Sequence, residues 1–159
     1  MSDAAAFPPT LEYVFELRVD VAAPIRIGAP GDDDLHFAAI LGGVVRGPRF
    51  NGRVLPGGGD WWRTKGDPED TYLDARYLIE ADDGATIEVQ NKGHFWLADA
   101  SFAAEYQARA PIPEAALYYR TSASFTTADY RYDWMNRHVF VGLARPECDV
   151  VCIRVFRLC

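Results

Sequence analysis

Hydrophobic and polar residues alternate with a period of two along the first part of the chain. From Leu11 to Val21 every second residue is apolar, and most of the residues between them are charged. Because successive side chains of a strand point to opposite faces, this pattern predicts a long strand with one buried face. Pro24 and the glycine- and aspartate-rich run 28–34 end the alternation, so a loop is expected there.

Similar patterns recur as far as the C-terminus and predict an all-β chain. The Asp83-Gly84 pair lies between two of these runs, and Asp-Gly supplies the positive φ that a tight hairpin turn requires. We therefore expect the segments 73–80 and 85–90 to form a hairpin. The other expected strands are 35–40, 43–46, 50–55, 118–125, 136–143 and 150–158.

Only the segment from Leu97 to Ala110 departs from the strand pattern. It is rich in alanine, and Pro111 and Pro113 close it, so one short helix is expected there. The rest of the chain supplies roughly eight to ten short strands, mainly antiparallel. Such strands close their edges most simply as a small β-barrel, whose interior is either filled by side chains or holds one small ligand.

The size and composition of the chain are those of one soluble domain. We expect a flexible N-terminus over residues 1–10 and a single β-barrel domain over residues 11–159, without internal repeats. The apolar fraction of 49% is typical of a folded globular protein, and no apolar run approaches the ~20 residues that span a bilayer. Residues 1–10 show no secretion signal, so a cytoplasmic protein is expected.

The net charge of -7 and the pI near 4.9 argue against nucleic acid and anionic membranes as partners. The basic residues are spread singly along the chain, whereas a nucleic-acid-binding protein gathers them into a patch. A small hydrophobic or aromatic ligand is the partner that remains. The apolar first strand with its acidic flanks leaves a homodimer open.

The sequence predicts neither a metal nor an organic cofactor. Cys148, Cys152 and Cys159 are odd in number, which argues against a disulfide framework, and the three histidines are not spaced with them as zinc ligands. No dinucleotide-binding fingerprint is present, and no Gly-x-Ser-x-Gly motif marks a serine nucleophile. Acid/base chemistry is the enzymatic class that remains.

Several short motifs carry a resemblance to a known family. They are the run Gly47 to Trp61, Asp74-Ala75-Arg76-Tyr77, Asp83-Gly84, Asn91-Lys92-Gly93, Tyr118-Tyr119-Arg120-Thr121 and the run Trp134 to Gly142. With these motifs the chain resembles the domain-of-unknown-function 3237 family from about Leu11 to Phe156. The resemblance implies a small β-barrel of calycin-like appearance and implies no particular activity.

Asp74 and Arg76 are the first candidate catalytic residues. They are two positions apart on an expected strand, so their side chains point to the same face. If that face is the lumen, Arg76 can hold an anionic or carbonyl group of a ligand while Asp74 orients it or moves a proton. The alternative, given equal weight, is a salt bridge on the outer wall of the barrel.

A second candidate set follows from the expected strand 136–143. Trp134, Asn136, His138 and Phe140 would share one face and form a pocket wall. His138 is a candidate acid/base residue because the ordinary pKa of histidine, about 6.5, suits proton transfer near neutral pH. The family resemblance does not support a shared role for His138, because the family usually has a small or apolar residue there, and a packed, hydrogen-bonded histidine is the favoured alternative.

Further ligand contacts are expected at the mouth of the barrel. Asp60 and Trp61 follow three glycines in a loop that can approach a ligand, although such glycines also serve an ordinary turn. Tyr118 and Arg120 share a strand face, where they can stabilise a developing enolate or simply pack. Asn91 and Trp96 complete the expected contacts, with Trp96 in a lid formed by the helix and its approach.

These residues lead to one functional hypothesis and two rivals. We expect a cofactor-independent acid/base enzyme, of isomerase, cyclase or lyase type, that acts on a small hydrophobic or aromatic, polyketide-like molecule in the barrel lumen. The first rival is a non-catalytic binding or carrier barrel that uses the same pocket. The second is an interaction module whose lumen is filled by side chains.

Overall fold

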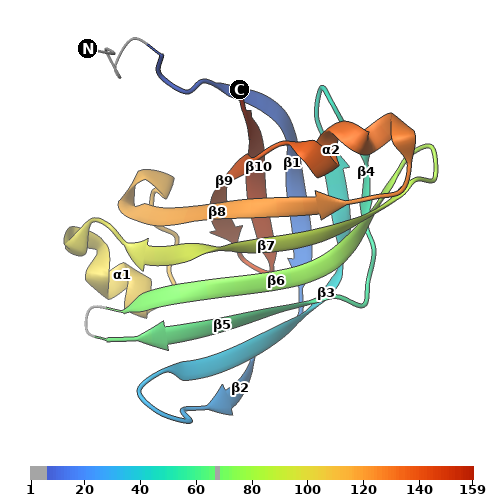
Figure 1. Cartoon of the computed structure of the whole chain (residues 1–159). Coiled ribbons are helices and arrows are strands. Elements are labelled where there is room, and N and C mark those ends of the chain that lie inside the picture. Colours follow the sequence, from blue (N-terminus) through green and yellow to red (C-terminus); the bar gives the residue numbers. More distant parts are fainter. Residues whose placement is uncertain (1–6, 67–68) are drawn as a thin grey trace.

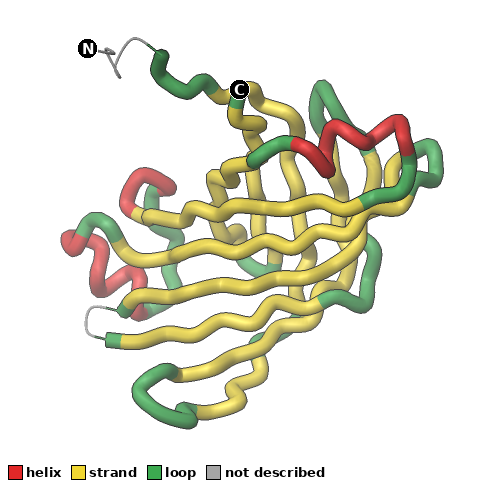
Figure 2. Tube along the Cα trace, viewed as in Figure 1, coloured by secondary structure: helices red, strands yellow, loops and turns green. Residues whose placement is uncertain are grey.

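The computed structural model describes residues 7–66 and 69–159, which form one antiparallel sheet of ten strands. The strands are β1 (Leu11–Val21), β2 (Ile25–Gly28), β3 (Asp34–Arg46), β4 (Gly52–Val54), β5 (Gly59–Lys65), β6 (Asp70–Ala81), β7 (Thr86–Leu97), β8 (Leu117–Thr126), β9 (Phe140–Glu147) and β10 (Val150–Leu158). The sheet runs β1-β10-β9-β8-β7-β6-β4-β3-β2, and β5 pairs with β3 and β6 off this path. An added pairing of β1 with β3 closes the sheet. The prediction of a small all-β barrel is confirmed (Figures 1 and 2).

The expected hairpin and the expected helix are both present. β6 and β7 pair from Glu80 and Thr86 outward, and Gly84 in their turn has a φ of 90°, a conformation that glycine adopts without strain. Within the segment 97–110 lie a 3₁₀ turn, Ala100–Phe102, and the helix α1 (Ala103–Gln107).

A second helix was not predicted, and it corrects the expected strand 136–143. The chain forms a 3₁₀ turn at Tyr130–Tyr132 and then α2 (Asp133–Arg137), and β9 begins only at Phe140. Asp129 explains the start of this segment, because its side chain accepts a hydrogen bond from the backbone N–H of Arg131. Trp134 and Asn136 therefore lie on a helix and His138 follows it, so these three residues do not share one face of a strand.

The two ends of the barrel differ. α1 and α2 lie at opposite ends (Figure 1). At the α2 end Phe15, Phe125 and Phe140 pack edge to face, with ring centroids 5.7 and 4.9 Å apart, and Met135 of α2 is buried against this core. Such packing fills that half of the lumen with apolar side chains. A polar chamber lies in the other part of the lumen, toward the α1 end.

β3 shapes the α1 end because it changes partners along its length. Its second half pairs with β1 and β4, whereas its first half pairs with β2 and β5. The first half of β3 pairs with β5, so the inward-facing residues of these two strands line the mouth of the barrel. None of the helices in the described part of the chain is long and apolar enough to cross a membrane.

Candidate active site in the barrel lumen

The burial pattern of β6 decides which face of the wall looks inward. Its odd-numbered residues from Thr71 to Ile79 are buried, and the even-numbered residues between them are more exposed. Asp74 and Arg76 consequently lie on the outer wall, where Arg76 Nε donates to Glu88 Oε1 at 2.6 Å and Asp74 Oδ2 is 3.7 Å from Lys92 Nζ. This corrects the expectation that Asp74 and Arg76 form a pair in the lumen. Both form salt bridges on the outer wall, Asp74 with Lys92 and Arg76 with Glu88.

A chamber of about 30 Å³ lies in the lumen, with its polar wall on β5, β6, β7 and β8 and its other wall residues on β1, β3, β6 and β10. This is enough for one or two water molecules. Its polar walls are Asp60, Tyr77, Asn91, Tyr119 and Thr121, and its aliphatic walls are Val19, Val21, Ile40, Leu73, Ala75, Val151 and Ile153. None of these described wall residues is a lysine or an arginine.

Strand register brings the polar wall residues together. Asp60 of β5 faces Ala75 of β6, which in turn faces Asn91 of β7. One step toward the mouth, Gly93 of β7 faces Thr121 of β8. Ala75 and Gly93 carry almost no side chain, so they leave space between the longer polar groups.

The polar atoms of this chamber lack partners. Asp60 Oδ1, the Tyr77 hydroxyl, Asn91 Oδ1 and Thr121 Oγ1 are buried, and none has a hydrogen-bond partner within residues 7–66 and 69–159. A buried polar group without a partner costs about 1–3 kcal/mol, so native proteins hold few of them. Four such groups around one chamber indicate a place where a polar ligand or solvent binds.

Burial also changes the proton affinities in the chamber. It raises the pKa of Asp60 from 3.8 to about 7, with a smaller contribution from the negative charge of Asp74. It raises the pKa of Tyr77 and of Tyr119 above the ordinary tyrosine value, with the Asp60 charge as the next cause in each. Asp60 can therefore exchange a proton near neutral pH, while both phenols stay protonated and act as hydrogen-bond donors.

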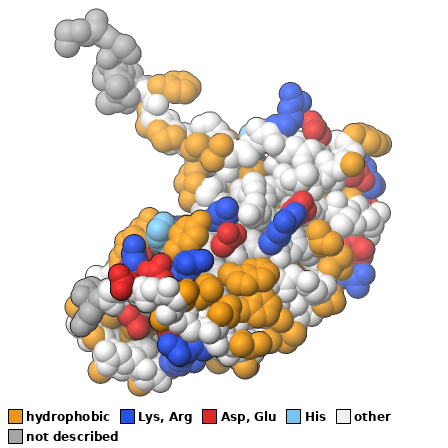
Figure 3. Space-filling model, turned by 60° about the horizontal axis from the view of Figure 1, so that its bottom comes forward, with side chains coloured by type: hydrophobic (Ala, Val, Ile, Leu, Met, Phe, Trp, Pro, Cys, Tyr) orange, Lys and Arg blue, Asp and Glu red, His pale blue; other side chains and the backbone are white. Residues whose placement is uncertain are grey.

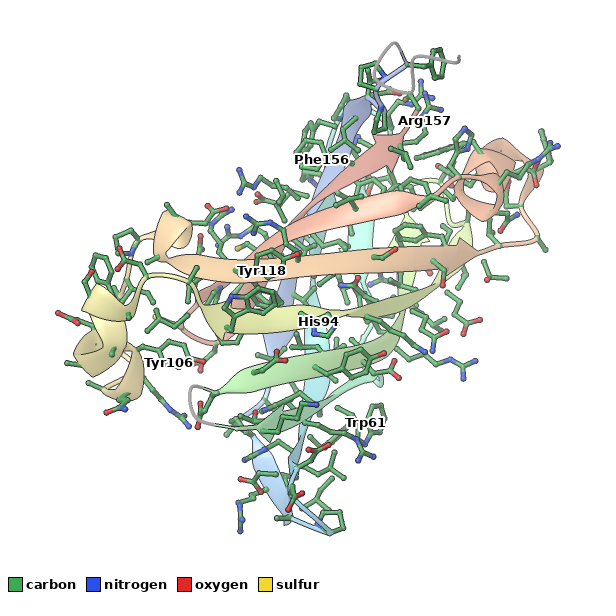
Figure 4. The ribbon with its side chains drawn as sticks, turned by 60° about the vertical axis from the view of Figure 1, so that its left-hand side comes forward. Trp61, His94, Tyr106, Tyr118, Phe156 and Arg157 are labelled. Carbon is green, nitrogen blue, oxygen red and sulfur yellow. The ribbon has the colours of Figure 1, made fainter. Side chains whose placement is uncertain are left out.

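Aromatic side chains surround the mouth of the chamber. The Phe95 ring packs 4.9 Å from Tyr119 and 5.8 Å from Tyr106 of α1, which lies at this end of the barrel (Figure 4). On the β3 and β5 side, the rings of His36 and Trp62 are stacked. An apolar or aromatic molecule whose polar end enters the chamber would meet these rings.

The residues expected to form the lid and a second polar wall lie outside the barrel. Trp96 stacks on Tyr118, with centroids 3.8 Å apart, and the Arg120 guanidinium lies 5.2 Å from the Tyr118 ring centroid. These outward rings follow from strand alternation, since Phe95 and Tyr119 point inward. Phe95 rather than Trp96 therefore lines the mouth, which corrects the expected contacts of Trp96, Tyr118 and Arg120.

The residues near α2 have structural contacts and lie away from the chamber. His138 is exposed, and its Nδ1 is 2.7 Å from the carbonyl oxygen of Trp134. Asn136 joins α2 to the preceding loop, because its amide donates to the Thr127 carbonyl and accepts from the Thr127 N–H. Trp134 packs 5.9 Å from Phe140. The pocket wall expected from these residues is not formed.

Trp61 lies on the outer face of β5 and is 45% exposed. Its ring packs 4.8 Å from that of Phe37 beside an outer groove of about 500 Å³, which also contacts Pro56 and Leu78. Hydrophobic side chains gather on this side of the molecule (Figure 3). Of the residues predicted to bind a ligand, only Asp60 and Asn91 are among the described residues that line the chamber.

Sequence reasoning missed Tyr77, Tyr119, Thr121 and His36. The signal for Tyr77 was available, because the odd-numbered face of β6 is apolar and the even-numbered face carries Asp74, Arg76 and Glu80. For the others the missing information was which strands are neighbours across the barrel. In the described residues, no group of three or more His, Cys, Asp or Glu side chains is arranged to hold a metal ion.

Fold and site together define a small antiparallel β-barrel with a polar chamber inside one end. The family model described as "Protein of unknown function (DUF3237)" matches residues 9–158, and the chain belongs to this family. The resemblance noted from the sequence motifs is thus confirmed.

Relatives of similar length support the assignment. A UPF0311 protein of Rhodopseudomonas palustris is 32% identical over 152 residues, which is 94% of this chain and 98% of that protein. A UPF0311 protein of Clostridium acetobutylicum is 35% identical over 151 residues, 92% of each chain. A more distant relative, the hydroalkoxylation enzyme phnH of Penicillium herquei, is 29% identical over 130 residues, which is 81% of this chain and 70% of that enzyme.

Solved structures share the fold. A conserved protein of unknown function from Rhodopseudomonas palustris superposes with a TM-score of 0.86 at 28% identity, covering 96% of this chain and 98% of that one. A beta-barrel like protein from Acinetobacter baumannii gives a TM-score of 0.84 at 28% identity, covering 96% and 97%. An enzyme from Penicillium herquei, at 21% identity and a TM-score of 0.71 over 96% of each chain, is similar in fold.

Proposed function

We propose that this protein is a cofactor-independent acid/base enzyme that adds the oxygen of a substrate hydroxyl group and a proton across a carbon–carbon double bond of a small hydrophobic or aromatic molecule, or catalyses the reverse elimination. The observation that carries the proposal is Asp60, a lumen carboxyl group with an unpartnered oxygen and a pKa of about 7, among neutral hydrogen-bond donors. The name of the Penicillium herquei relative, a hydroalkoxylation enzyme, supports this reaction class.

The chamber suits an alkene that is conjugated to a carbonyl group. When a substrate hydroxyl oxygen bonds to the far carbon of such an alkene, negative charge moves to the carbonyl oxygen. The hydroxyls of Tyr77, Tyr119 and Thr121 can donate hydrogen bonds to that oxygen. Donors fixed in a water-poor site stabilise such a charge strongly, by about 3–4 kcal/mol for a single donor.

Asp60 supplies the proton that completes the addition. In its acid form it gives a proton to the carbon next to the carbonyl group, so that one C–O and one C–H bond form while the π bond of the alkene and the O–H bond of the substrate break. The hydroxyl proton leaves to a base. A carboxyl group with a pKa near the working pH is suited to this transfer, because both of its protonation states are populated.

The volume of the chamber limits what enters it. About 30 Å³ admits a polar group and not a ring, so the body of the substrate would contact Phe95, Trp62 and Tyr106 at the mouth. Movement of these side chains would admit more of the ligand. The same contacts would serve a binding or carrier protein, so turnover must be tested directly.

A deuterium experiment tests the proposal. The protein is incubated in D₂O with a panel of hydroxy-enones, and the products are separated and their masses are measured. Addition places one deuterium on the carbon next to the carbonyl group, and we expect the Asp60→Asn variant to lose at least about 100-fold in rate. Asp74→Asn, the same chemical change on the outer wall, is the matched control and should change the rate far less, because it lowers the pKa of Asp60 but leaves its carboxyl group in place.

Two results would contradict the enzyme proposal. The first is an Asp60→Asn variant that turns over the substrate as fast as the native protein. The second is a compound that raises the melting temperature and is recovered without deuterium, which would favour the carrier. A ligand at 100 times its Kd stabilises a fold by about 2.7 kcal/mol, so a carrier ligand would be detected.

A further inference from the structure

His36 of β3 lies on the inner face of the barrel wall, one step toward the mouth from Ala38 and Asp60, in a chain of charged side chains. Its Nε2 is 3.7 Å from Asp34 Oδ2, and the Asp34 carboxylate accepts hydrogen bonds of 2.9 and 3.0 Å from Nε of Arg26. Asp34 is thus fixed by the arginine on one side and faces the imidazole on the other. An acidic partner on one ring nitrogen determines which nitrogen carries the proton.

Stacking fixes the plane of the His36 ring. The ring lies parallel to that of Trp62, with an angle of 5° between the planes and 5.3 Å between the centroids. Trp62 packs in turn against the hydrophobic core. The imidazole is therefore positioned by two groups, the Asp34 carboxylate near Nε2 and the Trp62 ring against its face.

Strand register puts His36 on the same side of the wall as Asp60. Ala38 of β3 faces Asp60 of β5, and His36 faces Trp62, so His36 and Asp60 are diagonal neighbours on the inner face. The Cα atoms of diagonal neighbours on adjacent strands are about 7–8 Å apart. His36 is the one nearer the mouth.

The second ring nitrogen of His36 is unused. Nδ1 is buried and has no hydrogen-bond partner among the residues that the structure describes. The two other histidines differ: His138 Nδ1 meets the Trp134 carbonyl, and His94 is exposed on the outer wall, with Nδ1 3.8 Å from Asp70. An oriented imidazole with one free, buried nitrogen is the arrangement of a general base.

We propose that His36 is a second acid/base residue of the lumen site, which takes the hydroxyl proton of the substrate through Nδ1, and that Asp34 and Trp62 are its positioning residues. The inference rests on the proposed function, which requires a base besides the protonated Asp60. The hydroxyl proton moves to Nδ1 as the C–O bond forms, and Asp60 gives its proton to carbon. Transfer of a proton from the imidazolium to the Asp60 carboxylate, through water, restores both groups.

Nitrogen NMR of the ¹⁵N-histidine-labelled protein, with phenol as the hydroxyl probe, tests this inference. We expect His36 to carry its proton on Nε2 and phenol to shift the His36 Nδ1 resonance, with His138 unmoved. Asp34→Ala should leave a mixture of the two tautomers. A proton on Nδ1 in the native protein, or a Nδ1 resonance that phenol does not shift, would overturn the proposal.

The methyl resonances of residues that line the chamber show whether a negative result contradicts only this inference or also the proposed function. If phenol shifts the methyl resonances of Ala75 and Thr121 and leaves His36 unchanged, the chamber binds a hydroxyl compound and His36 is not its base. If neither responds, both proposals fall. With a turned-over substrate, His36→Gln should cost about 100-fold or more in rate and remove one limb of the pH profile. Asp74→Asn should keep both limbs and lose far less rate, because it lowers the pKa of Asp60 without removing its carboxyl group.

Discussion

Asp60 and Asp74 lie on neighbouring strands and on opposite faces of the same barrel wall. In the pairing of β5 with β6, Asp74 faces Trp61, the residue next to Asp60. Asp60 points into the chamber, whereas the Asp74 side chain is 41% exposed beside Lys92. One carboxyl group is therefore poised for proton transfer, and the other serves the outer surface.

The first prediction concerns the dependence of stability on pH. The pKa of Asp60 in the fold, about 7, lies above the ordinary value of 3.8, so the folded state binds the proton more tightly than the unfolded state. The contribution of Asp60 to stability is full below about pH 4 and is lost as the pH rises to about 7, a change of up to about 4 kcal/mol.

The Asp60→Asn variant provides the comparison for this prediction. Asparagine does not ionise, so the variant should gain in melting temperature relative to the native protein as the pH rises from 4 to 8. Other carboxylates titrate equally in both proteins and cancel in the difference. A constant difference across this range would mean that Asp60 has an ordinary pKa.

The second prediction concerns the outer carboxylate. The charge of Asp74 is the lesser of the two causes that raise the pKa of Asp60. Asp74→Asn should therefore lower the pKa of Asp60 while keeping it well above 3.8, because burial, the larger cause, remains. Carbon-detected NMR of the Asp60 carboxyl group measures this value, and its complete return to 3.8 would show that burial is not the main cause.

The third prediction concerns Gly58, which lies against the backbone of the chamber wall. A Cβ at this position would be 2.4 Å from the Tyr77 Cβ and 2.6 Å from the Arg76 carbonyl oxygen. Gly58→Ala should cost about 1–3 kcal/mol in free energy of unfolding and shift the Tyr77 resonances. Gly31→Ala, whose Cβ would meet no described atom within 4 Å, is the control in urea denaturation. Equal midpoints for the two variants would refute the close contact.

The fourth prediction separates the inner from the outer aromatic residue of β7. Phe95 packs against Tyr119 and Tyr106, so Phe95→Ala should open the mouth and improve binding of 2-naphthol relative to phenol. Its cost in stability should be at most about 3–5 kcal/mol, the range for a fully buried phenylalanine. Trp96→Ala removes an outer stack and should leave the ratio of the two Kd values unchanged. The opposite pattern would restore Trp96 as the lid residue.

Local sequence predicted the strands well where one face is apolar and a turn signal ends the run. The hairpin at Asp83-Gly84 is an example, because both the alternation and the turn chemistry are local properties. The segment 133–137 was mistaken for the approach to a strand, because five residues fit a period of two as well as a helical turn. What fixes the helix is burial of Met135 against the core, a contact with residues distant in sequence.

The sequence by itself determined an antiparallel barrel, the family to which the chain belongs, and the presence of Asp60 and Asn91 among the ligand-binding candidates. Only the tertiary structure decided that Asp60, and not Asp74, faces the lumen, and that His36, and not His138, shares the inner face of the wall with Asp60. The reason is physical: alternation separates the two faces of a strand, but closure of the sheet decides which face is inside and which strands meet there. The burial that raises the pKa of Asp60 arises from that closure.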